Sequence, residues 1–263
     1  MSGPYKPSLL RVNKYFTYID YLKEFVACGD FKSVGASFRY VMTHKGPKQD
    51  YVTSSKMGNF LIRKGTNDFQ FINRAYEKKI KEYMQANLDS FDVFIDVGAC
   101  IGEYCVWLAK QGKRCIAIEP VNFRAIEKNI SLNKLQDKIQ LFACGLGNKK
   151  DRVHFNIPED VTSSSYMDRE GKGEPNVDID TLDSLSEKFN IKESDRILIK
   201  LDVEGMEWEV IEGGKNFIAR HKSLTFIYED FITDDFRNDK ALASIAPFNF
   251  SYLDQVNRIA VKK

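Results

Sequence analysis

Glycines and carboxylates are interleaved in residues 91–104, which read FDVFIDVGACIGEY. An apolar run ends at Asp96, and Gly98 and Gly102 then allow the backbone to turn sharply and approach a ligand where a Cβ would collide. A second apolar run ends in the lone carboxylate of Glu119, and an acid at such a strand end accepts hydrogen bonds from the hydroxyls of a ribose. The pattern predicts a pocket for a nucleoside-bearing cofactor.

The acids that flank this turn, Asp96 and Glu103, favour one cofactor over another. A dinucleotide places its pyrophosphate against bare backbone and is typical of G-x-G-x-x-G, whereas this turn has two glycines and carboxylates that would repel phosphate. S-adenosylmethionine has no phosphate and carries a sulfonium and an ammonium group, which acids attract. We therefore predict S-adenosylmethionine rather than NAD. An α/β domain that turns on glycines without a cofactor is the remaining alternative.

A second group of acids follows another apolar run, within residues 197–214. Asp202 and Glu204 come at its carboxyl end, where open α/β sheets bind ligands. Because strand side chains alternate, these two acids share one face if the strand extends that far. They would then border the same pocket as Asp96 and Glu119. Unpaired buried carboxylates are costly, so we interpret the four acids as functional rather than as a structural network.

The composition is that of a globular protein with a sizeable core. With 43% hydrophobic and 29% charged residues among 263, the chain fits one domain with an elaboration. No apolar run approaches the ~20 residues of a membrane span, and the N-terminus lacks the apolar core of a signal peptide. We expect a cytoplasmic protein without membrane contact.

Cysteine and histidine usage predicts neither disulfides nor a metal site. The five cysteines form no C-x-x-C pair, which indicates reduced thiols. His44, His154 and His221 are too dispersed for a zinc site, and the latter two are typical of surface or capping residues. Basic residues outnumber acids over residues 1–90, which is typical of solvated helix faces and would alternatively guide an anionic substrate.

Residues 1–90 are predicted to form a cap of helices and a hairpin. The apolar spacing predicts two helices within 8–43, broken at 28–30, a hairpin over 51–62, and a helix that begins at Thr66 or Asn67 and runs to about Asn87. This cap could form a lid over a methyl acceptor. Asp68, Tyr76 and the polar loop 162–165 are further candidates for an acceptor pocket.

Residues 91–263 are predicted to form the cofactor-binding domain. Strands alternate with helices, which indicates an α/β fold with a mostly parallel sheet and helices on both faces. The expected strands cover 92–97, 114–118, 138–143, 151–157, 177–179, 197–201 and 224–228, with a final hairpin over 250–261, and the expected helices cover 103–111, 122–133, 181–189 and 206–219.

Several of these motifs together resemble the FkbM family of S-adenosylmethionine-dependent methyltransferases. They are Ile95–Gly102, Glu119-Pro120, Asn129 with Asn133, Thr181–Leu185 and Lys200–Glu207, and Gly58–Phe60 and Arg63–Asp68 look like the family's opening segment. The resemblance covers about 56–230. It implies the class I methyltransferase (Rossmann-like) fold and O-methylation of a hydroxyl on a sugar or small-molecule metabolite.

The sequence departs from the family pattern at two places. The family usually has Asn at the position of Cys100. Class I enzymes often place an acid after the third strand to meet the adenine amine, but here the chain reads Ala143-Cys-Gly-Leu146. We therefore expect backbone groups and apolar packing at Gly145 and Leu146 to hold the adenine.

These considerations give a set of site residues. The predicted cofactor-binding residues are Asp96, Gly98, Ala99, Cys100, Gly102, Glu103, Glu119, Pro120, Gly145, Leu146 and Asp202. A hydroxyl acceptor gains from a general base, for which the candidates are Glu204 first, Asp202 second and Glu229 third. Asp202 could instead bind the cofactor's ammonium group. No metal is predicted, although Mg²⁺ on Asp202 and Glu204 is a lesser alternative.

Two other functions remain open from the sequence. The basic N-terminal part would suit a methyltransferase that acts on a macromolecule such as nucleic acid, but the catalytic part has no basic stripe interleaved with aromatic residues. A non-catalytic nucleoside-binding module is disfavoured because the acids are intact. The sequence predicts neither the acceptor's identity nor the oligomeric state.

Overall fold

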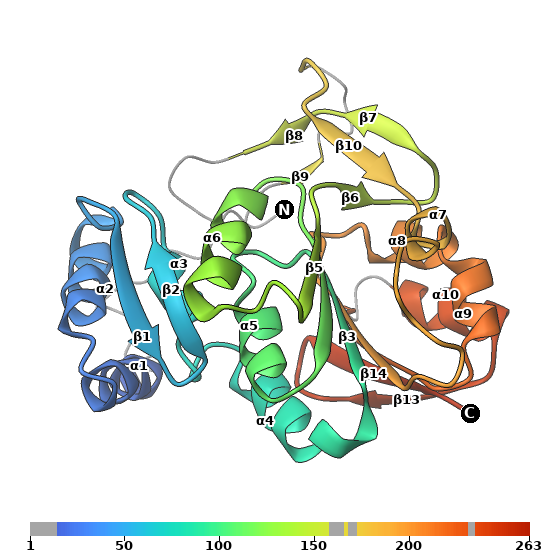
Figure 1. Ribbon diagram of the computed structural model, residues 1–263, viewed down its shortest axis with the longest axis horizontal. Helices are drawn as coiled ribbons and strands as arrows, with labels where there is room; N and C mark the ends of the chain where they lie inside the picture. The colour runs from blue at the N-terminus through green and yellow to red at the C-terminus, as the bar shows by residue number, and fades with distance from the viewer. Residues whose placement is uncertain (1–14, 158–165, 168–172, 231–234) are drawn as a thin grey trace.

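A seven-stranded sheet forms the centre of the protein (Figure 1). The structure, a computed structural model, describes residues 15–157, 166–167, 173–230 and 235–263. The strand order is β13-β14-β12-β11-β3-β4-β5. The parallel strands are β3 (Val93–Val97), β4 (Arg114–Ile118), β5 (Ile139–Phe142), β11 (Ile197–Leu201) and β12 (Leu224–Glu229), and the antiparallel pair at one edge is β13 (Phe248–Tyr252) and β14 (Asn257–Lys262). Among the described residues, no helix is long and apolar enough to cross a membrane.

Helices cover both faces of this sheet, and strand alternation decides what each face buries. Val93, Ile95 and Val97 point into one apolar core, whereas Phe94 points into the other. The core around Phe94 lies under α5 (Glu103–Lys110) and α6 (Phe123–Asn133). The opposite core lies under α7 (Leu182–Ser186), α8 (Glu207–Glu212), α9 (Lys215–Arg220) and α10 (Arg237–Ile245). The α/β fold predicted from the sequence is therefore confirmed.

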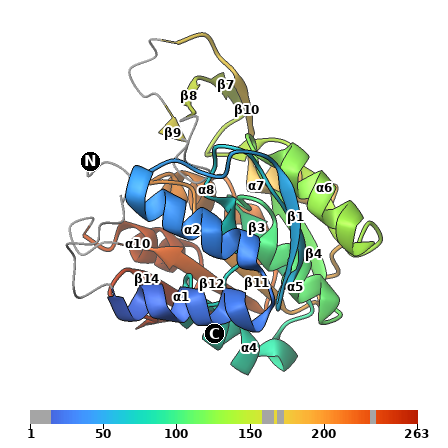
Figure 2. The same ribbon diagram turned by 90° about the vertical axis from the view of Figure 1, so that its left-hand side faces the viewer.

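The N-terminal elements pack against α5 and α6 rather than extending the sheet (Figure 2). They are α1 (Tyr15–Ala27), α2 (Phe31–Thr43), the hairpin of β1 (Tyr51–Ser55) and β2 (Gly58–Ile62), α3 (Asp68–Phe71) and α4 (Lys78–Ala86). Two amides of α6 bind the free edge of β2. Asn133 accepts from Asn59 N–H and donates to its carbonyl, and Asn129 accepts from Leu61 N–H. These family-motif residues thus have a docking role.

Replacing Asn133 with alanine is expected to loosen this docked hairpin. The substitution leaves the N–H and C=O groups of Asn59 without their partner, and we expect the free energy of unfolding to fall by about 2 kcal/mol. Urea denaturation measures this change. Ser131→Ala, on the exposed side of the same helix, is the matched control, and equal stabilities of the two variants would contradict the docking role.

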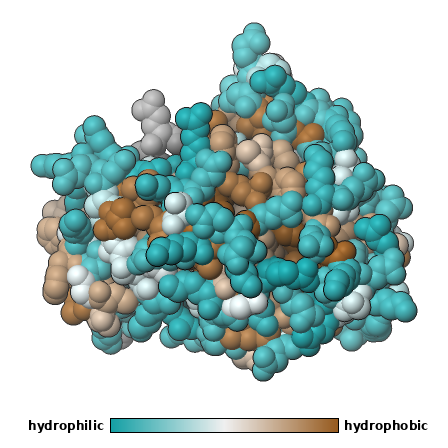
Figure 3. All heavy atoms as spheres, in the orientation of Figure 1, coloured by the Kyte–Doolittle hydropathy of each residue, from teal (hydrophilic) through white to brown (hydrophobic). Residues whose placement is uncertain are grey.

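A small arm of strands projects beyond the sheet. It contains β6 (Gly145–Leu146), β10 (Val177–Asp180) and β7 (Asp151–Val153), with the separate pair β8 (Phe155–Asn156) and β9 (Tyr166–Met167). Figure 3 shows apolar residues gathered directly below this arm. A small buried cluster joins Phe155, Val177 and Ile179 of the arm to Met206. The predicted strand over 151–157 is therefore wrong as one element, because its two halves pair in different sheets.

Two predicted helices are each divided in two. The helix expected from Thr66 to about Asn87 is interrupted between α3 and α4, where Lys81 Nζ binds the carbonyls of Phe71, Asn73 and Tyr76. The helix expected over 206–219 ends at Gly213, and α9 begins anew. Its first N–H groups, at 216 and 217, donate to Asp183, which belongs to the predicted Thr181–Leu185 motif. Tertiary contacts override helical spacing at both breaks.

Candidate functional site

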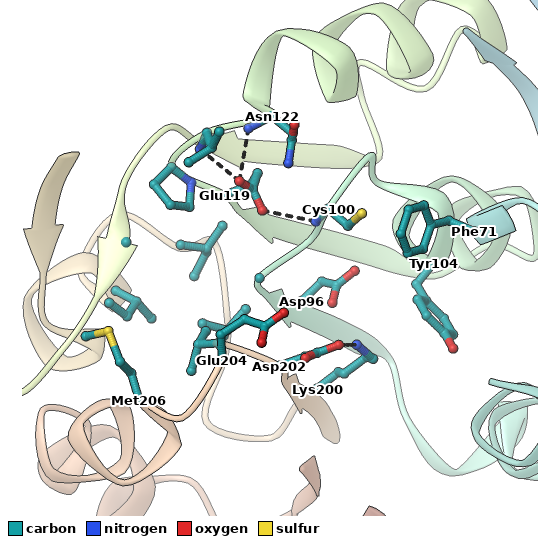
Figure 4. A pocket seen from close by; sticks show the side chains of 18 of the residues that line it. Phe71, Asp96, Cys100, Tyr104, Glu119, Asn122, Lys200, Asp202, Glu204 and Met206 are labelled. Carbon is teal, nitrogen blue, oxygen red and sulfur yellow. Dashed lines mark hydrogen bonds and ion pairs between the residues drawn. The ribbon is translucent and has the colours of Figure 1, made fainter. Parts of the chain in front are cut away.

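A cavity lies at the carboxyl ends of β3 and β11. At this point the strand order changes direction, since β4 and β5 lie on one side of β3 and β11 and β12 lie on the other. Such reversal points leave a crevice outside the strand ends, where α/β proteins bind ligands. The cavity has a volume of about 830 Å³, part of it open to solvent. Its polar lining is mainly acidic, and the side chains concerned are Glu77, Asp96, Glu103, Glu119, Asp202 and Glu204, with Lys200 as the one basic residue among the described lining residues (Figure 4).

The glycine turn after β3 is pressed against the end of β11. Gly98 has φ +84°, and a Cβ there would lie 1.9 Å from the backbone oxygen of Asp202. The N–H groups of Gly98 and Ala99 both donate to the carbonyl of Ile118 on β4. The turn therefore bridges three strand ends. Ala99 and Gly102 shape it without lining the cavity, whereas Gly98 and Cys100 line it.

Glu119, at the end of β4, is fixed by the backbone around it. One carboxylate oxygen accepts from Cys100 N–H at 3.1 Å, and the other accepts from Val121 and Asn122 N–H at 2.8 and 3.0 Å. Burial raises the pKa of Glu119, and these three N–H groups oppose that rise. The oxygen that accepts from Cys100 has a further lone pair, so the group can still accept a hydrogen bond from the cavity.

Strand alternation places Asp96 and Lys200 on the same side of the sheet, next to one another. The two residues are register partners on β3 and β11, and both face α5. Asp96 is 1% exposed, and its Oδ1 has no hydrogen-bond partner among the described residues. Burial raises the pKa of Asp96 to about 7, against the lowering effect of Lys200. The cavity thus contains a buried carboxylate with an unused oxygen.

Lys200 joins the strand end to the N-terminal elements. Its Nζ lies 2.6 Å from Asp202 Oδ2 and 4.0 Å from Glu77 Oε2. Glu77 also accepts a hydrogen bond of 2.7 Å from the Tyr104 hydroxyl. Lys200, Glu77 and Tyr104 were not among the predicted site residues. Lys200 could have been found from its position two residues before Asp202, because alternate residues of a strand point to the same side. No sequence pattern predicts that Glu77 lies here.

Glu204 lies at the exposed mouth of the cavity in a left-handed conformation, with φ +54°. The strand ends at Leu201, so Asp202 and Glu204 do not share a strand face as expected, although both line the cavity. Desolvation raises the pKa of Glu204 to about 7, with the Asp202 and Glu207 carboxylates acting in the same direction. Glu207 accepts from Val203 N–H at 3.1 Å and so orders this loop.

The end of the cavity below the projecting arm is apolar. Its side chains are Val121, Leu146, Phe155, Val203 and Met206, and Pro120, Cys144 and Gly145 also line the wall. No carboxylate occurs among these residues, so a flat apolar group such as a nucleobase would meet packing and backbone rather than an acid.

Of the other residues considered from the sequence, some line the cavity and others lie away from it. Tyr76 lines the cavity, whereas Asp68 is buried in an ion pair with Arg63. Glu229 does not line the cavity, although burial raises its pKa to about 8. The loop 162–165 lies outside the described residues. His221 was expected to be a surface or capping residue. It is the C-cap of α9 but is buried, since it is 2% exposed and packs on the ring of Phe217 at 4.3 Å. Its carbonyl accepts a hydrogen bond from Lys262 Nζ on β14.

Fold and cavity together define the class I methyltransferase-like architecture: a mostly parallel seven-stranded sheet with a site at its strand ends. The methyltransferase FkbM domain matches residues 96–252, more than half of the chain. The chain belongs to the FkbM methyltransferase family. This membership confirms the resemblance seen in the motifs, and the family implies S-adenosylmethionine as cofactor. A search of curated proteins found no match.

Solved structures with a similar fold include methyltransferase FkbM from Methylobacillus flagellatus, at 19% identity and a TM-score of 0.47. A tRNA (uracil-54, C5)-methyltransferase from Pyrococcus abyssi is similar at 11% identity and a TM-score of 0.43. The alignments cover 73% and 82% of this chain but only 53% and 44% of those proteins. The chain therefore spans about half their length.

Proposed function

We propose that this protein is an S-adenosylmethionine-dependent methyltransferase that methylates a hydroxyl group of a sugar or small-molecule metabolite. The observation that carries the proposal is the acid-lined cavity at the strand ends of a chain of the FkbM family. Gly98 provides a cradle that a Cβ would fill, and Asp96 offers an unused carboxylate oxygen. Glu119 would accept a hydrogen bond from a ribose hydroxyl. The cofactor supplies a methyl group on a positively charged sulfur.

The protein's own residues would position the acceptor and supply a general base. Methyl transfer is an in-line displacement, so holding the acceptor oxygen near the methyl group supplies much of the acceleration. Glu204, at the mouth, would take the hydroxyl proton as the new bond forms. Its pKa of about 7 suits a base at neutral pH. We further propose that residues 1–90 act as a cap on the cofactor-binding domain of residues 91–263, supported by Phe71, Tyr76 and Glu77 in the cavity lining.

Calorimetric titration tests the cofactor assignment first. We expect the full chain to bind S-adenosylmethionine and S-adenosylhomocysteine and to show no heat with NAD, because acidic side chains at Asp96 and Glu103 flank the glycine turn where a pyrophosphate needs bare backbone. A folded protein that binds neither sulfur compound would refute the proposed function. Incubation with hydroxylated sugars and metabolites, followed by mass spectrometry for an added methyl group, then identifies the acceptor.

Glu204→Gln is expected to separate catalysis from cofactor binding. With the acceptor found by that screen, the variant should transfer methyl groups about 100-fold more slowly, because general-base catalysis contributes on that scale. The affinity for S-adenosylmethionine should stay unchanged. In the wild-type protein the rate should rise with pH through about 7, as the carboxylate loses its proton. A parallel loss of rate and affinity would assign Glu204 to cofactor binding instead.

A further inference from the structure

The helix α2 carries large apolar side chains on its outer face. Phe31 and Phe38 are each 70% exposed, and Met42 is 55% exposed. The buried residues of the same helix are Ser33, Ala36 and Tyr40. A surface helix normally turns its largest apolar side chains toward the core and its polar side chains toward water. In α2 two phenylalanines and a methionine face outward while a serine is buried, so packing within this chain does not account for the outer face.

The exposed apolar side chains form stripes and are not scattered. With 3.6 residues per turn, Phe31, Phe38 and Met42 fall within about 40° of one another around the axis of α2. The neighbouring helix α1 has a second exposed apolar stripe at helical spacing, which consists of Ile19, Leu22 and Val26. The two helices pack against one another and form the outermost layer of the N-terminal elements (Figure 2). Such a gathered apolar surface is typical of an interaction site.

The charges beside the stripe of α2 are all positive. Residues 31–49 contain Lys32, Arg39, Lys45 and Lys48 and no acidic residue. Lys32 and Arg39 are seven residues apart, and each directly follows a phenylalanine of the stripe, so both lie along the same flank of it. The three lysines are exposed. Long basic side chains keep their charge in water while their stems lie along an apolar surface. The outer face of α2 is therefore apolar with a basic border.

We propose that α1 and α2 dock on the surface of an anionic lipid bilayer, with Phe31, Phe38 and Met42 inserted at the level of the headgroups. A helix with aromatic residues on one face and Lys or Arg beside them lies in this way in the plane of a membrane interface. The basic border would meet the negative charge of the lipids. Docking of this kind needs no apolar run of ~20 residues, and the expectation of no membrane contact rested on that criterion. It does not depend on the proposed methyltransferase activity.

Charge favours a lipid surface over a second copy of this chain. A two-fold interface sets the same patch of two copies face to face. Lys32, Lys45 and Lys48 of one copy would then approach those of the other, with no acid in 31–49 to compensate, and like charges repel. On α1, Asp20 is balanced by Lys23 at 4.0 Å. A bilayer that contains anionic lipids offers the opposite charge over the whole patch.

Sedimentation of the full chain with lipid vesicles tests the docking. We expect binding to phosphatidylcholine vesicles that contain about one-third phosphatidylserine, weaker binding to pure phosphatidylcholine, and release from the anionic vesicles as salt screens the charges. Phe31→Ser combined with Phe38→Ser should lower the partition coefficient about 100-fold, because transfer of each phenylalanine out of water contributes about tenfold or more. Lys32→Gln combined with Lys45→Gln should lower it about 25-fold, at about fivefold for each charge.

Matched controls make the same kinds of change away from this face. Val261→Ser on β14 and Lys128→Gln on α6 replace exposed residues and should bind vesicles as the wild type does. Because every replaced residue is exposed, circular dichroism should show that all variants fold.

Two results would overturn the proposal directly: no binding of the wild type to anionic vesicles, or binding that the double serine variant retains. A dimer in solution that the double serine variant dissociates would assign the face to self-association instead. The calorimetric titration with S-adenosylmethionine is a separate measurement, so failure of membrane docking is distinguishable from failure of the proposed function.

Discussion

Gly98→Ala is expected to destabilise the protein by about 3–5 kcal/mol and to abolish cofactor binding. The new Cβ would lie 1.9 Å from the backbone oxygen and 2.9 Å from the carbonyl carbon of Asp202, closer than any real contact. Asp202 cannot move away, because its N–H donates to Val97 and the preceding strand pairs on both sides. The φ of +84° adds strain. Urea denaturation and calorimetry with S-adenosylhomocysteine measure the two effects.

Gly112→Ala separates steric collision from backbone strain. Gly112 has a similar φ of +88°, but a Cβ there would meet nothing within 4 Å. This control should cost only about 1–2 kcal/mol, the price of a left-handed conformation, and should leave cofactor affinity unchanged. If Gly98→Ala were no less stable than Gly112→Ala and still bound the cofactor, the close packing of the turn on β11 would be wrong.

Glu119→Gln is expected to lower the affinities for S-adenosylmethionine and S-adenosylhomocysteine about 100-fold, because both compounds contain the ribose. A hydrogen bond to a charged group contributes about 1.5–3 kcal/mol, and a ribose hydroxyl would depend on the remaining lone pair of this carboxylate. The glutamine oxygen could still accept from Val121 and Asn122 N–H, but its NH2 group would then face the N–H of Cys100. The loss of affinity therefore combines a disturbed local backbone with a weaker hydrogen bond to the ligand.

A matched control and the pattern across ligands identify the cause. Glu127→Gln makes the same chemical change on the exposed side of α6 and should leave both affinities unaltered. Equal weakening of the two ligands would show that Glu119 acts on a part that both share and not on the sulfonium charge. Retention of wild-type affinity for S-adenosylhomocysteine in a folded Glu119→Gln protein would contradict the ribose assignment.

The parts of the fold that sequence reasoning obtained correctly are those with strong local signals. Apolar runs and their spacing identified every strand of the parallel sheet, and the glycines and acids after those runs identified the strand ends at which the cavity lies. Helix breaks were missed. The Lys81 ammonium donates to three carbonyls between α3 and α4. Gly213 lies against Gly147, where a Cβ on Gly213 would be 2.0 Å from the Gly147 oxygen. Both causes are contacts between distant segments.

The sequence by itself determined the α/β class, the family and the acids after the parallel strands, because strand periodicity, glycine turns and strand-end carboxylates are all local patterns. Only the tertiary structure decided which of these groups meet. Register between β3 and β11 makes Asp96 and Lys200 neighbours, and docking of the N-terminal elements brings Glu77 to the same ammonium. Burial in that setting, which depends on every packed element, gives the carboxylates their raised pKa values. Charge balance in the site is therefore a property of the folded chain, since desolvation and Coulomb forces act through space and not along the sequence.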